Sequence, residues 1–379
     1  MSEFSPADLK RNQYLLFSFF LYTTFHGALR KWAFLGNSAI DNALFFTQLI
    51  LPFVIVYFMK RQKPMLTYQP LIPYAILLIA LALNPMNQTI YHGIFGFILH
   101  FSFWLIMLTY LNERDAFPLE SLVKGFIIIC LIEAGLGFTQ FSLPSSHFIN
   151  RYVSSDNVDG FDNDQGVRII GTFSYIAGYS SFLLFFGLFV WGLMVENKRA
   201  LVLIFGLGAM GLVSAFMNGS RATVLPFVIA IIFGFINYGS FANKLKAVVA
   251  IFILVTLGFV FNVDKKLTAI ERSYVAFEGR VKYGQKSGEA QGRTLKTFVA
   301  ITDFEGKYPL LGMGLGATYQ GAISKWGKYR ELGYFEEEPE RVLLEGGYLL
   351  FTVRCLLFIF LITQLKIPWI YSVPILFYL

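Results

Sequence analysis

The amino-acid sequence predicts an all-α polytopic membrane protein with about eleven transmembrane helices and one large extracytoplasmic loop between the ninth and tenth helices. Of its 379 residues, 56% are hydrophobic and 15% are charged. Soluble domains average about 45–50% hydrophobic and about 25% charged residues. Nearly uncharged windows recur along the chain, and each is long enough to cross about 30 Å of hydrocarbon. Composition and window length together exclude an ordinary soluble domain.

The predicted helices follow one another from the first apolar window to the end of the sequence. We place them at Gln13–Leu29, Ala39–Met59, Pro70–Leu83, Thr89–Leu111, Ser121–Leu143, Gly171–Val195, Ala200–Met217, Thr223–Tyr238, Lys246–Asn262, Val342–Ile362 and Ile367–Leu379, of which the last is short. No internal repeat and no low-complexity linker divides the chain. We therefore expect helices one to nine in residues 1–262, the large loop in residues 263–341 and the C-terminal helices in residues 342–379.

Basic residues in the short connections predict the orientation in the membrane. The segments Lys60–Lys63, Glu196–Arg199 and Asn243–Lys246 fall on the same side as Lys10 and Arg11. Cytoplasmic loops carry an excess of Lys and Arg, so this side and the N-terminus are predicted to be cytoplasmic. The net charge of +7 reflects this topology rather than nucleic-acid binding. We expect no cleavable signal peptide, and no disulfide or zinc site, because both cysteines lie in apolar runs.

The large loop contains a pattern typical of an amphipathic helix. Leu295, Phe298 and Val299 share one helical face, while Arg293 and Lys296 share another,. We expect this helix to lie at the membrane surface and to be followed by the glycine-rich turn "YPLLGMGLG". A nucleotide-binding loop is not expected there, because no strand precedes the turn and no Lys-Ser/Thr follows it.

Several arginines on the predicted external side run against the positive-inside bias, among them Arg168, Arg221, Arg293 and Arg341. Arg221 lies in the turn between two predicted helices, where Gly219 allows a tight bend,. Arginine keeps its charge when partly desolvated, and its planar guanidinium matches phosphate oxygens. Together these residues predict a site for an anionic headgroup such as a lipid-linked pyrophosphate. The alternative for each is a side chain that extends to the interface or pairs with a loop carboxylate.

Five segments appear in a characteristic order: "RIIGTFSYIAGYSSFLL", "NGSRAT", "QGRTLKTF", "PLLGMGLG" and "EEEPERVLLEGGYLLFTVR". This order resembles the O-antigen ligase and polymerase superfamily of bacterial surface polysaccharide assembly, over about half of the chain. An Arg in a short turn of that family resembles Arg221, and a Gly-Arg at a loop helix resembles Gly292–Arg293. The family's Pro–x–x–Gly–x–Gly turn resembles Pro309–Gly314, and its Glu–x–Gly resembles Glu345–Gly347.

The resemblance implies a multi-pass glycosyltransferase of the bacterial cytoplasmic membrane that acts in cell-envelope polysaccharide biosynthesis. Its substrate would be an oligosaccharide on a polyprenyl pyrophosphate such as undecaprenyl pyrophosphate, transferred to an acceptor hydroxyl with inversion on the extracytoplasmic side. Other partners would be membrane lipid and further polysaccharide assembly proteins. Ligases of the family commonly carry a His-Asn pair about nine residues before the Glu. Here that stretch, "YFEEEPERVLLEGG", has no histidine, and its Glu–x–x–Arg resembles a branch without the loop histidine.

The chemistry of such a transfer assigns roles to particular residues. A departing pyrophosphate needs fixed cations, and we assign this catalytic role to Arg221 and Arg293, with Arg168 and Arg341 as further pyrophosphate ligands. The acceptor hydroxyl needs a base within hydrogen-bond reach, for which we choose Glu338.

Glu336, Glu337 and Glu340 are alternative bases, and a solvated acidic patch is the non-functional alternative for the whole run. The supporting residues are Glu345, Gly312 and Gly314. We expect no cofactor and no metal, because fixed arginines can meet the charge of the leaving pyrophosphate without one.

Two charged residues fall inside predicted helices: Glu133 and Arg354. A charge at the bilayer centre costs at least about 2.5–3.5 kcal/mol, so each should face a partner or a cavity. One hypothesis is that they pair with each other. Glu133 also favours an alternative function, a transporter or flippase for lipid-linked saccharide, because polar residues at mid-membrane are typical of transporters. A third interpretation is a membrane scaffold whose loop binds a partner.

Overall fold

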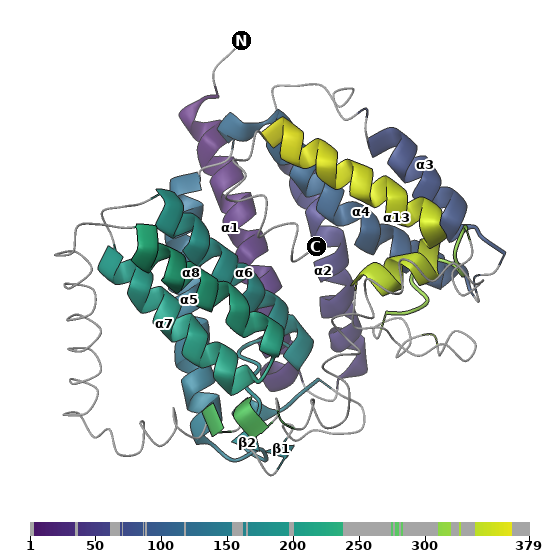
Figure 1. Cartoon of the computed structure of the whole chain (residues 1–379). Helices are drawn as coiled ribbons and strands as arrows, with labels where there is room; N and C mark the ends of the chain where they lie inside the picture. The colour runs from purple at the N-terminus through teal and green to yellow at the C-terminus, as the bar shows by residue number, and fades with distance from the viewer. Residues whose placement is uncertain are drawn as a thin grey trace, which may run out of the picture. The chain divides into compact units, whose positions relative to one another are not determined.

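The computed structural model describes residues 4–34, 37–60, 69, 71–85, 87, 89–116, 119–153, 162–163, 166–196, 201–237, 274–275, 277–279, 282, 310–319, 326 and 338–365. Its longer helices are α1 (Pro6–Ala28), α2 (Ser38–Phe58), α3 (Leu71–Ala82), α4 (Ile90–Asn112), α5 (Leu119–Ser142), α6 (Ile176–Glu196), α7 (Leu201–Asn218), α8 (Arg221–Asn237) and α13 (Glu338–Leu365) (Figure 1). Three short helices, η1 (Leu29–Ala33), η3 (Arg114–Ala116) and η4 (Phe148–Asn150), and the antiparallel pair β1 (Asp162–Asn163) and β2 (Gly166–Val167) complete the described elements.

These elements confirm the predicted helical membrane character. Five described helices are long and apolar enough to cross a membrane: Ala39–Phe58, Ile90–Asn112, Leu119–Ser142, Ile176–Glu196 and Glu338–Gln364. The total of eleven spans, the extracytoplasmic position of the large loop and the cytoplasmic N-terminus stay predictions. The windows Lys246–Asn262 and Ile367–Leu379 lie outside the described residues, as does the predicted amphipathic helix around Arg293.

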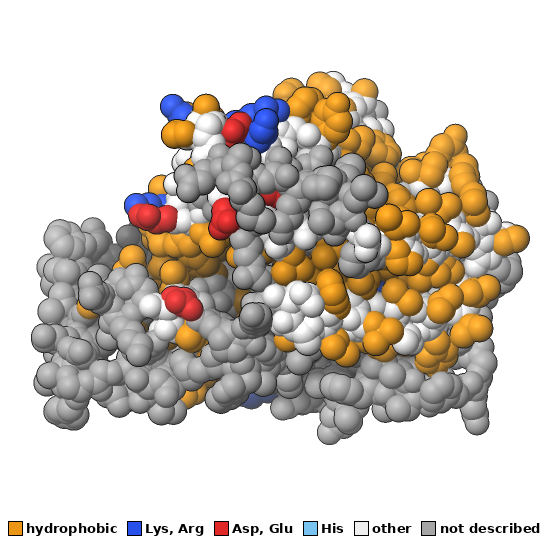
Figure 2. Space-filling model, turned by 90° about the horizontal axis from the view of Figure 1, so that it is seen from above, with side chains coloured by type: hydrophobic (Ala, Val, Ile, Leu, Met, Phe, Trp, Pro, Cys, Tyr) orange, Lys and Arg blue, Asp and Glu red, His pale blue; other side chains and the backbone are white. Residues whose placement is uncertain are grey.

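The surface of these helices is apolar in the way that contact with lipid requires. On α3 and at the residue that follows it, the side chains of Ile72, Ile76, Ile79 and Leu83 are 48–64% exposed and recur every three or four residues, so they form one stripe. Figure 2 shows hydrophobic side chains spread over the described surface of one face, where charged side chains are few. Water-exposed helix faces are normally polar, so this surface fits a hydrocarbon solvent.

The chain divides into two compact units. The first unit comprises residues 1–19, 45–122 and 288–379, and the second comprises residues 20–44 and 123–287. In the first unit, α3 packs on α4 and contacts α13. Its core includes Tyr74, Leu78, Trp104 and Leu350, which are 0–2% exposed. The Trp104 ring packs on Phe358 of α13, with ring centroids 4.7 Å apart.

In the second unit, helices α6, α7 and α8 pack on one another (Figure 1). Small residues allow this close approach. A Cβ atom on Gly187 would lie 2.5 Å from Pro226, and one on Gly211 would lie 2.1 Å from the Phe227 ring. Phe227 is fully buried as a result.

Candidate functional site

The candidate site in the first unit begins at a kink in α13. Gly347 has φ 65° and ψ −167°, which interrupts the helix, and Figure 1 draws α13 as a short and a long stretch that meet at an angle. The kink leaves backbone groups without helical partners, and buried backbone groups must find others. The Leu344 and Glu345 carbonyls accept hydrogen bonds from the N–H groups of Met313 (2.7 Å) and Gly314 (3.1 Å). The glycine-rich turn is therefore bound directly to the kink.

Two glycines of this turn are required by the close packing against α13 and its neighbours. Gly312 and Gly314 have φ of 69° and 115°, values that residues with a Cβ rarely adopt. A Cβ on Gly312 would lie 2.4 Å from the Glu345 carbonyl oxygen, and one on Gly314 would lie 1.9 Å from Asn87 Oδ1. The three residues that the sequence grouped as supporting, Gly312, Gly314 and Glu345, thus lie together. Their role in function stays a prediction.

The Glu345 carboxylate is fully buried and accepts four hydrogen bonds. Oε1 accepts from the Thr318 N–H (3.1 Å) and the Thr318 hydroxyl (2.6 Å). Oε2 accepts from the Gly316 N–H (2.9 Å) and faces His100 Nε2 at 3.0 Å. Hydrogen bonds to an ionised acceptor are the strongest type in proteins and compensate the loss of water. The donors of the glycine-rich turn therefore bind a carboxylate of the chain itself.

His100, on α4, connects this carboxylate to an arginine. Arg354 NH1 lies 3.1 Å from His100 Nδ1. A guanidinium can only donate, so Nδ1 accepts, and Nε2 carries the proton that is donated to Glu345. His100 is thereby assigned as the neutral Nε2–H tautomer. The His100 side chain is 1% exposed.

Sequence reasoning missed His100, because it looked for a histidine only within the loop. The available signal was an ionisable residue in the middle of an apolar helix, a position that usually marks a functional or paired side chain.

Glu338 stands between two arginines at the first turn of α13. Arg354 NH1 donates to Glu338 Oε1 at 2.6 Å, and Arg341 NH2 pairs with Glu338 Oε2. The side chains of Glu338, Arg341 and Arg354 are 35%, 18% and 15% exposed, so the carboxylate is the most accessible of the three. Sixteen residues of straight helix would separate Glu338 and Arg354 by about 24 Å. The kink at Gly347 makes their contact possible.

Arg341 also lies over the ring of Tyr319, with its guanidinium carbon 3.8 Å from the ring centroid. An arginine over an aromatic face gains a cation–π attraction that strengthens when water is excluded. Burial raises the pKa of the Tyr319 hydroxyl to about 12, so this group is neutral at physiological pH. The predicted base Glu338 and the predicted phosphate ligand Arg341 are therefore neighbours, at a position that is partly open to solvent.

The other predicted pyrophosphate ligands belong to the second unit or lie outside the described residues. Arg168 Nε donates to the carbonyl of Asn218, the last residue of α7, at 2.9 Å. Gly219 has φ 75°, which confirms the predicted tight bend, and α8 begins at Arg221. The Arg168 side chain and the backbone of Arg221 thus lie at the same end of the α7–α8 hairpin. The side chain of Arg221 is not among the described ones, and Arg293 lies outside the described residues.

Glu133 has partners other than the Arg354 that we considered. Its Oε2 accepts from the Thr172 N–H at 3.1 Å, and its Oε1 accepts from the Thr172 hydroxyl. Arg354 instead bonds to Glu338 and His100. Each of these two charged side chains therefore has described partners within its own unit.

The predicted helix Gly171–Val195 also begins later than expected, at Ile176. Gly171 has φ 54°, so the backbone is not helical there, and a side chain bonds to its N–H groups. Gln140 Oε1 accepts from the N–H groups of Ile170 (3.0 Å) and Gly171 (2.8 Å). Irregular backbone within a membrane protein is tolerated only where such partners exist.

Lys31, on η1, donates to the Gly171 carbonyl at 2.7 Å. Its side chain is almost fully buried, and this burial lowers the pKa of the Lys31 ammonium to about 7,.

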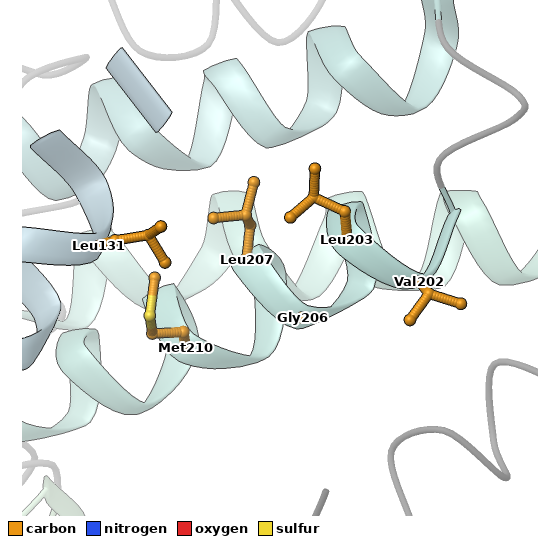
Figure 3. Close-up of a pocket in the computed structure, with 6 residues that line it drawn as sticks. All are labelled: Leu131, Val202, Leu203, Gly206, Leu207 and Met210. Carbon is orange, nitrogen blue, oxygen red and sulfur yellow. The ribbon is translucent and has the colours of Figure 1, made fainter. Parts of the chain in front are cut away.

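Two further features bear on the chemistry. Figure 3 shows a pocket on the second unit that is lined by apolar residues of α5 and α7: Leu131, Val202, Leu203, Gly206, Leu207 and Met210. It offers no group that could bind a phosphate or a sugar hydroxyl. Among the residues that the structure describes, no group of three or more His, Cys, Asp or Glu could hold a metal ion. A metal-independent reaction stays a prediction.

Comparisons with known proteins identify no relative. No protein-family model, no curated protein and no solved structure matches the chain. The resemblance to the O-antigen ligase and polymerase superfamily therefore rests on the motif order alone.

Proposed function

We propose that this chain is a membrane glycosyltransferase that polymerises or transfers an oligosaccharide from a polyprenyl pyrophosphate to an acceptor hydroxyl, on the extracytoplasmic side of the bacterial cytoplasmic membrane. The proposal is supported by the order of the sequence motifs. The observation that carries it is the placement of Glu338, a partly exposed carboxylate, between the guanidinium groups of Arg341 and Arg354. A base and a phosphate-binding cation side by side are what an inverting transfer from a pyrophosphate needs.

The two arginines differ in how firmly they are held, and this difference suggests their roles. Arg354 bonds to His100 as well as to Glu338. Arg341 pairs with Glu338 and stacks on Tyr319, and its buried Nε has no hydrogen-bond partner among the described residues. The Arg341 side chain is 18% exposed and has no second side-chain hydrogen bond in the described contacts, so we assign it to the pyrophosphate of the donor lipid.

The transfer step follows from these assignments. As the pyrophosphate binds Arg341, Oε2 of Glu338 is released to accept the proton of the acceptor hydroxyl. The hydroxyl oxygen then forms a bond to the anomeric carbon, and the bond from that carbon to the pyrophosphate oxygen breaks on the opposite face. The polyprenyl pyrophosphate leaves as an anion whose charge Arg341 meets. Arg221 and Arg293 keep their proposed role as further cations on the strength of the motifs.

A transporter or flippase for the same lipid-linked saccharide is the second candidate. The series Glu345, His100, Arg354 and Glu338 favours it, because linked ionisable side chains within membrane helices are also typical of proton and substrate pathways. A transporter would move the lipid and leave its glycan unchanged.

The test uses purified full-length protein in detergent with a polyprenyl-pyrophosphate oligosaccharide and no gradient. Longer or transferred glycan supports the enzyme, and glycan that stays unchanged while labelled lipid crosses proteoliposome bilayers supports the transporter. Arg341→Ala should reduce transfer by about 10²-fold or more. Arg221→Ala and Arg293→Ala test the remaining cations, and full activity in both would refute their assignment. Normal membrane insertion of each variant is the control.

A further inference from the structure

Arg354 is placed to fix the direction in which Glu338 points. Its NH1 group carries two protons, and these reach two acceptors, His100 Nδ1 at 3.1 Å and Glu338 Oε1 at 2.6 Å. Because the bond to His100 fixes the position of NH1, rotation of the Glu338 carboxylate would break its bond to Arg354. Arg341, in contrast, has no such second side-chain anchor in its described hydrogen bonds.

The anchor itself is rigid. The His100 ring is held on its other side by Glu345 Oε2 at 3.0 Å. Glu345 in turn is held by Gly316, the last residue of the glycine-rich turn, and by Thr318 just after it. His100 and Glu345 are 3% and 0% exposed, so water does not compete for these bonds. A continuous series of hydrogen bonds therefore runs from the turn, through α4, to the carboxylate at the start of α13.

We infer that His100 and Arg354 are positioning residues that hold Glu338 in the orientation for proton transfer, and that Glu345 fixes the tautomer of His100 that this requires. His100 is too buried to touch a substrate, so it acts through Arg354. Groups of this kind raise turnover, because a base displaced by as little as 1 Å loses much of its effect. The inference rests on the proposed glycosyl transfer.

Two substitutions of His100 separate the bond to Arg354 from the bond to Glu345. The amide of His100→Asn places an oxygen where Nδ1 stood, so it keeps an acceptor for Arg354 and loses the donor to Glu345. The amide of His100→Gln places a nitrogen where Nε2 stood, so it keeps the donor and loses the acceptor. The measurements are kcat and KM for the lipid-linked donor, and the melting temperature of each protein in detergent.

The inference predicts opposite orders for activity and stability. His100→Gln should lower kcat at least 10-fold with KM for the donor lipid within twofold of wild type, and His100→Asn should keep most of the wild-type kcat. His100→Asn should have the lower melting temperature, because it removes a donor from the buried Glu345 carboxylate. Arg354→Lys should behave like His100→Gln, since one ammonium cannot bridge both acceptors in the same geometry.

The outcomes distinguish this inference from the proposed function. If wild-type protein transfers no glycan, the proposed function fails. If wild-type protein is active but kcat follows the melting temperature across the three variants, or His100→Gln is as active as wild type, the positioning role is overturned. A ¹⁵N spectrum of the histidine rings gives a readout independent of activity: the inference requires a neutral His100 protonated at Nε2, and protonation at Nδ1 would contradict it.

Discussion

Replacement of Glu345 by glutamine tests the network at its most buried point. The substitution keeps the size of the side chain and turns one acceptor oxygen into an NH₂ group. Four donors face the wild-type carboxylate: the Gly316 N–H, the Thr318 N–H, the Thr318 hydroxyl and His100 Nε2. Glutamine has one oxygen, so two of these donors lose their acceptor.

The least costly orientation places the amide nitrogen towards Thr318, whose hydroxyl can rotate and become the acceptor. The Thr318 N–H is then left without a partner, which costs about 1–3 kcal/mol. The bonds to Gly316 and His100 lose the charge of the acceptor, at about 1 kcal/mol each. We therefore expect Glu345→Gln to lower the free energy of unfolding by about 3–5 kcal/mol.

The assay is the melting temperature of the purified protein in detergent, followed by a fluorescence probe at a fixed heating rate. Glu278→Gln is the matched control, because Glu278 is 44% exposed and pairs only with the exposed Lys282 among the described ion pairs. Its effect should lie within about 0.5 kcal/mol. If Glu345→Gln had the same melting temperature as the wild type and the control, the view that the turn binds a charged carboxylate would be refuted.

Three further predictions concern separate features of the chain. Gly171→Ala should destabilise the protein by more than about 2 kcal/mol, because Gly171 has φ 54° and a Cβ atom there would lie 2.0 Å from Glu133 Oε2. The control is Gly135→Ala, whose Cβ would have nothing within 4 Å and which should melt at or above the wild-type temperature. Equal melting temperatures of the two variants would contradict the close packing of Gly171 on Glu133. The pKa of Lys31 is about 7 in the folded protein, against 10.5 for the free group. Between pH 7 and pH 10.5, Lys31 is protonated in the unfolded state and neutral in the folded state. The free energy of unfolding should therefore rise as the pH increases from about 7 to about 10.5, by at most about 1.4 kcal/mol per pH unit. Lys31→Met should abolish that rise, and an unchanged pH dependence would show that Lys31 is not its source. Gly347→Ala should lower transferase activity by weakening the contact between Glu338 and Arg354, since φ is 65° at the kink; wild-type activity in this variant would show that the kink is not needed.

The parts of the structure that the sequence predicted depend on local features. Apolar windows such as Thr89–Leu111 predict helices because hydropathy and length are properties of the segment itself. Gly219 predicted a tight bend for a similar reason, since only its own backbone conformation was involved. The grouping of Gly312, Gly314 and Glu345 was also anticipated, although from the resemblance rather than from the physics of the turn.

The parts that were missed depend on contacts between distant segments. His100 and Glu345 are 245 residues apart, and no local sequence pattern predicts that they are in contact. Glu133 could not be assigned to Thr172 from the sequence, because 39 residues separate them and no pattern around either residue identifies the other as its partner. In the structure α6 begins at Ile176, and the Thr172 N–H, in the irregular segment before it, donates to Glu133. Ionisable residues within membrane helices were recognised as needing partners, but the choice of partner was set by packing.

The most direct test of the central claim is the rate of glycan transfer by Glu338→Gln protein. Wild-type, Glu338→Gln and Glu278→Gln proteins would be compared in detergent at saturating polyprenyl-pyrophosphate oligosaccharide. We predict that Glu338→Gln loses about 10²–10⁴-fold in kcat, the usual contribution of a general base, while Glu278→Gln keeps the wild-type rate. A Glu338→Gln protein that elongates or transfers glycan as fast as the wild type would contradict the account.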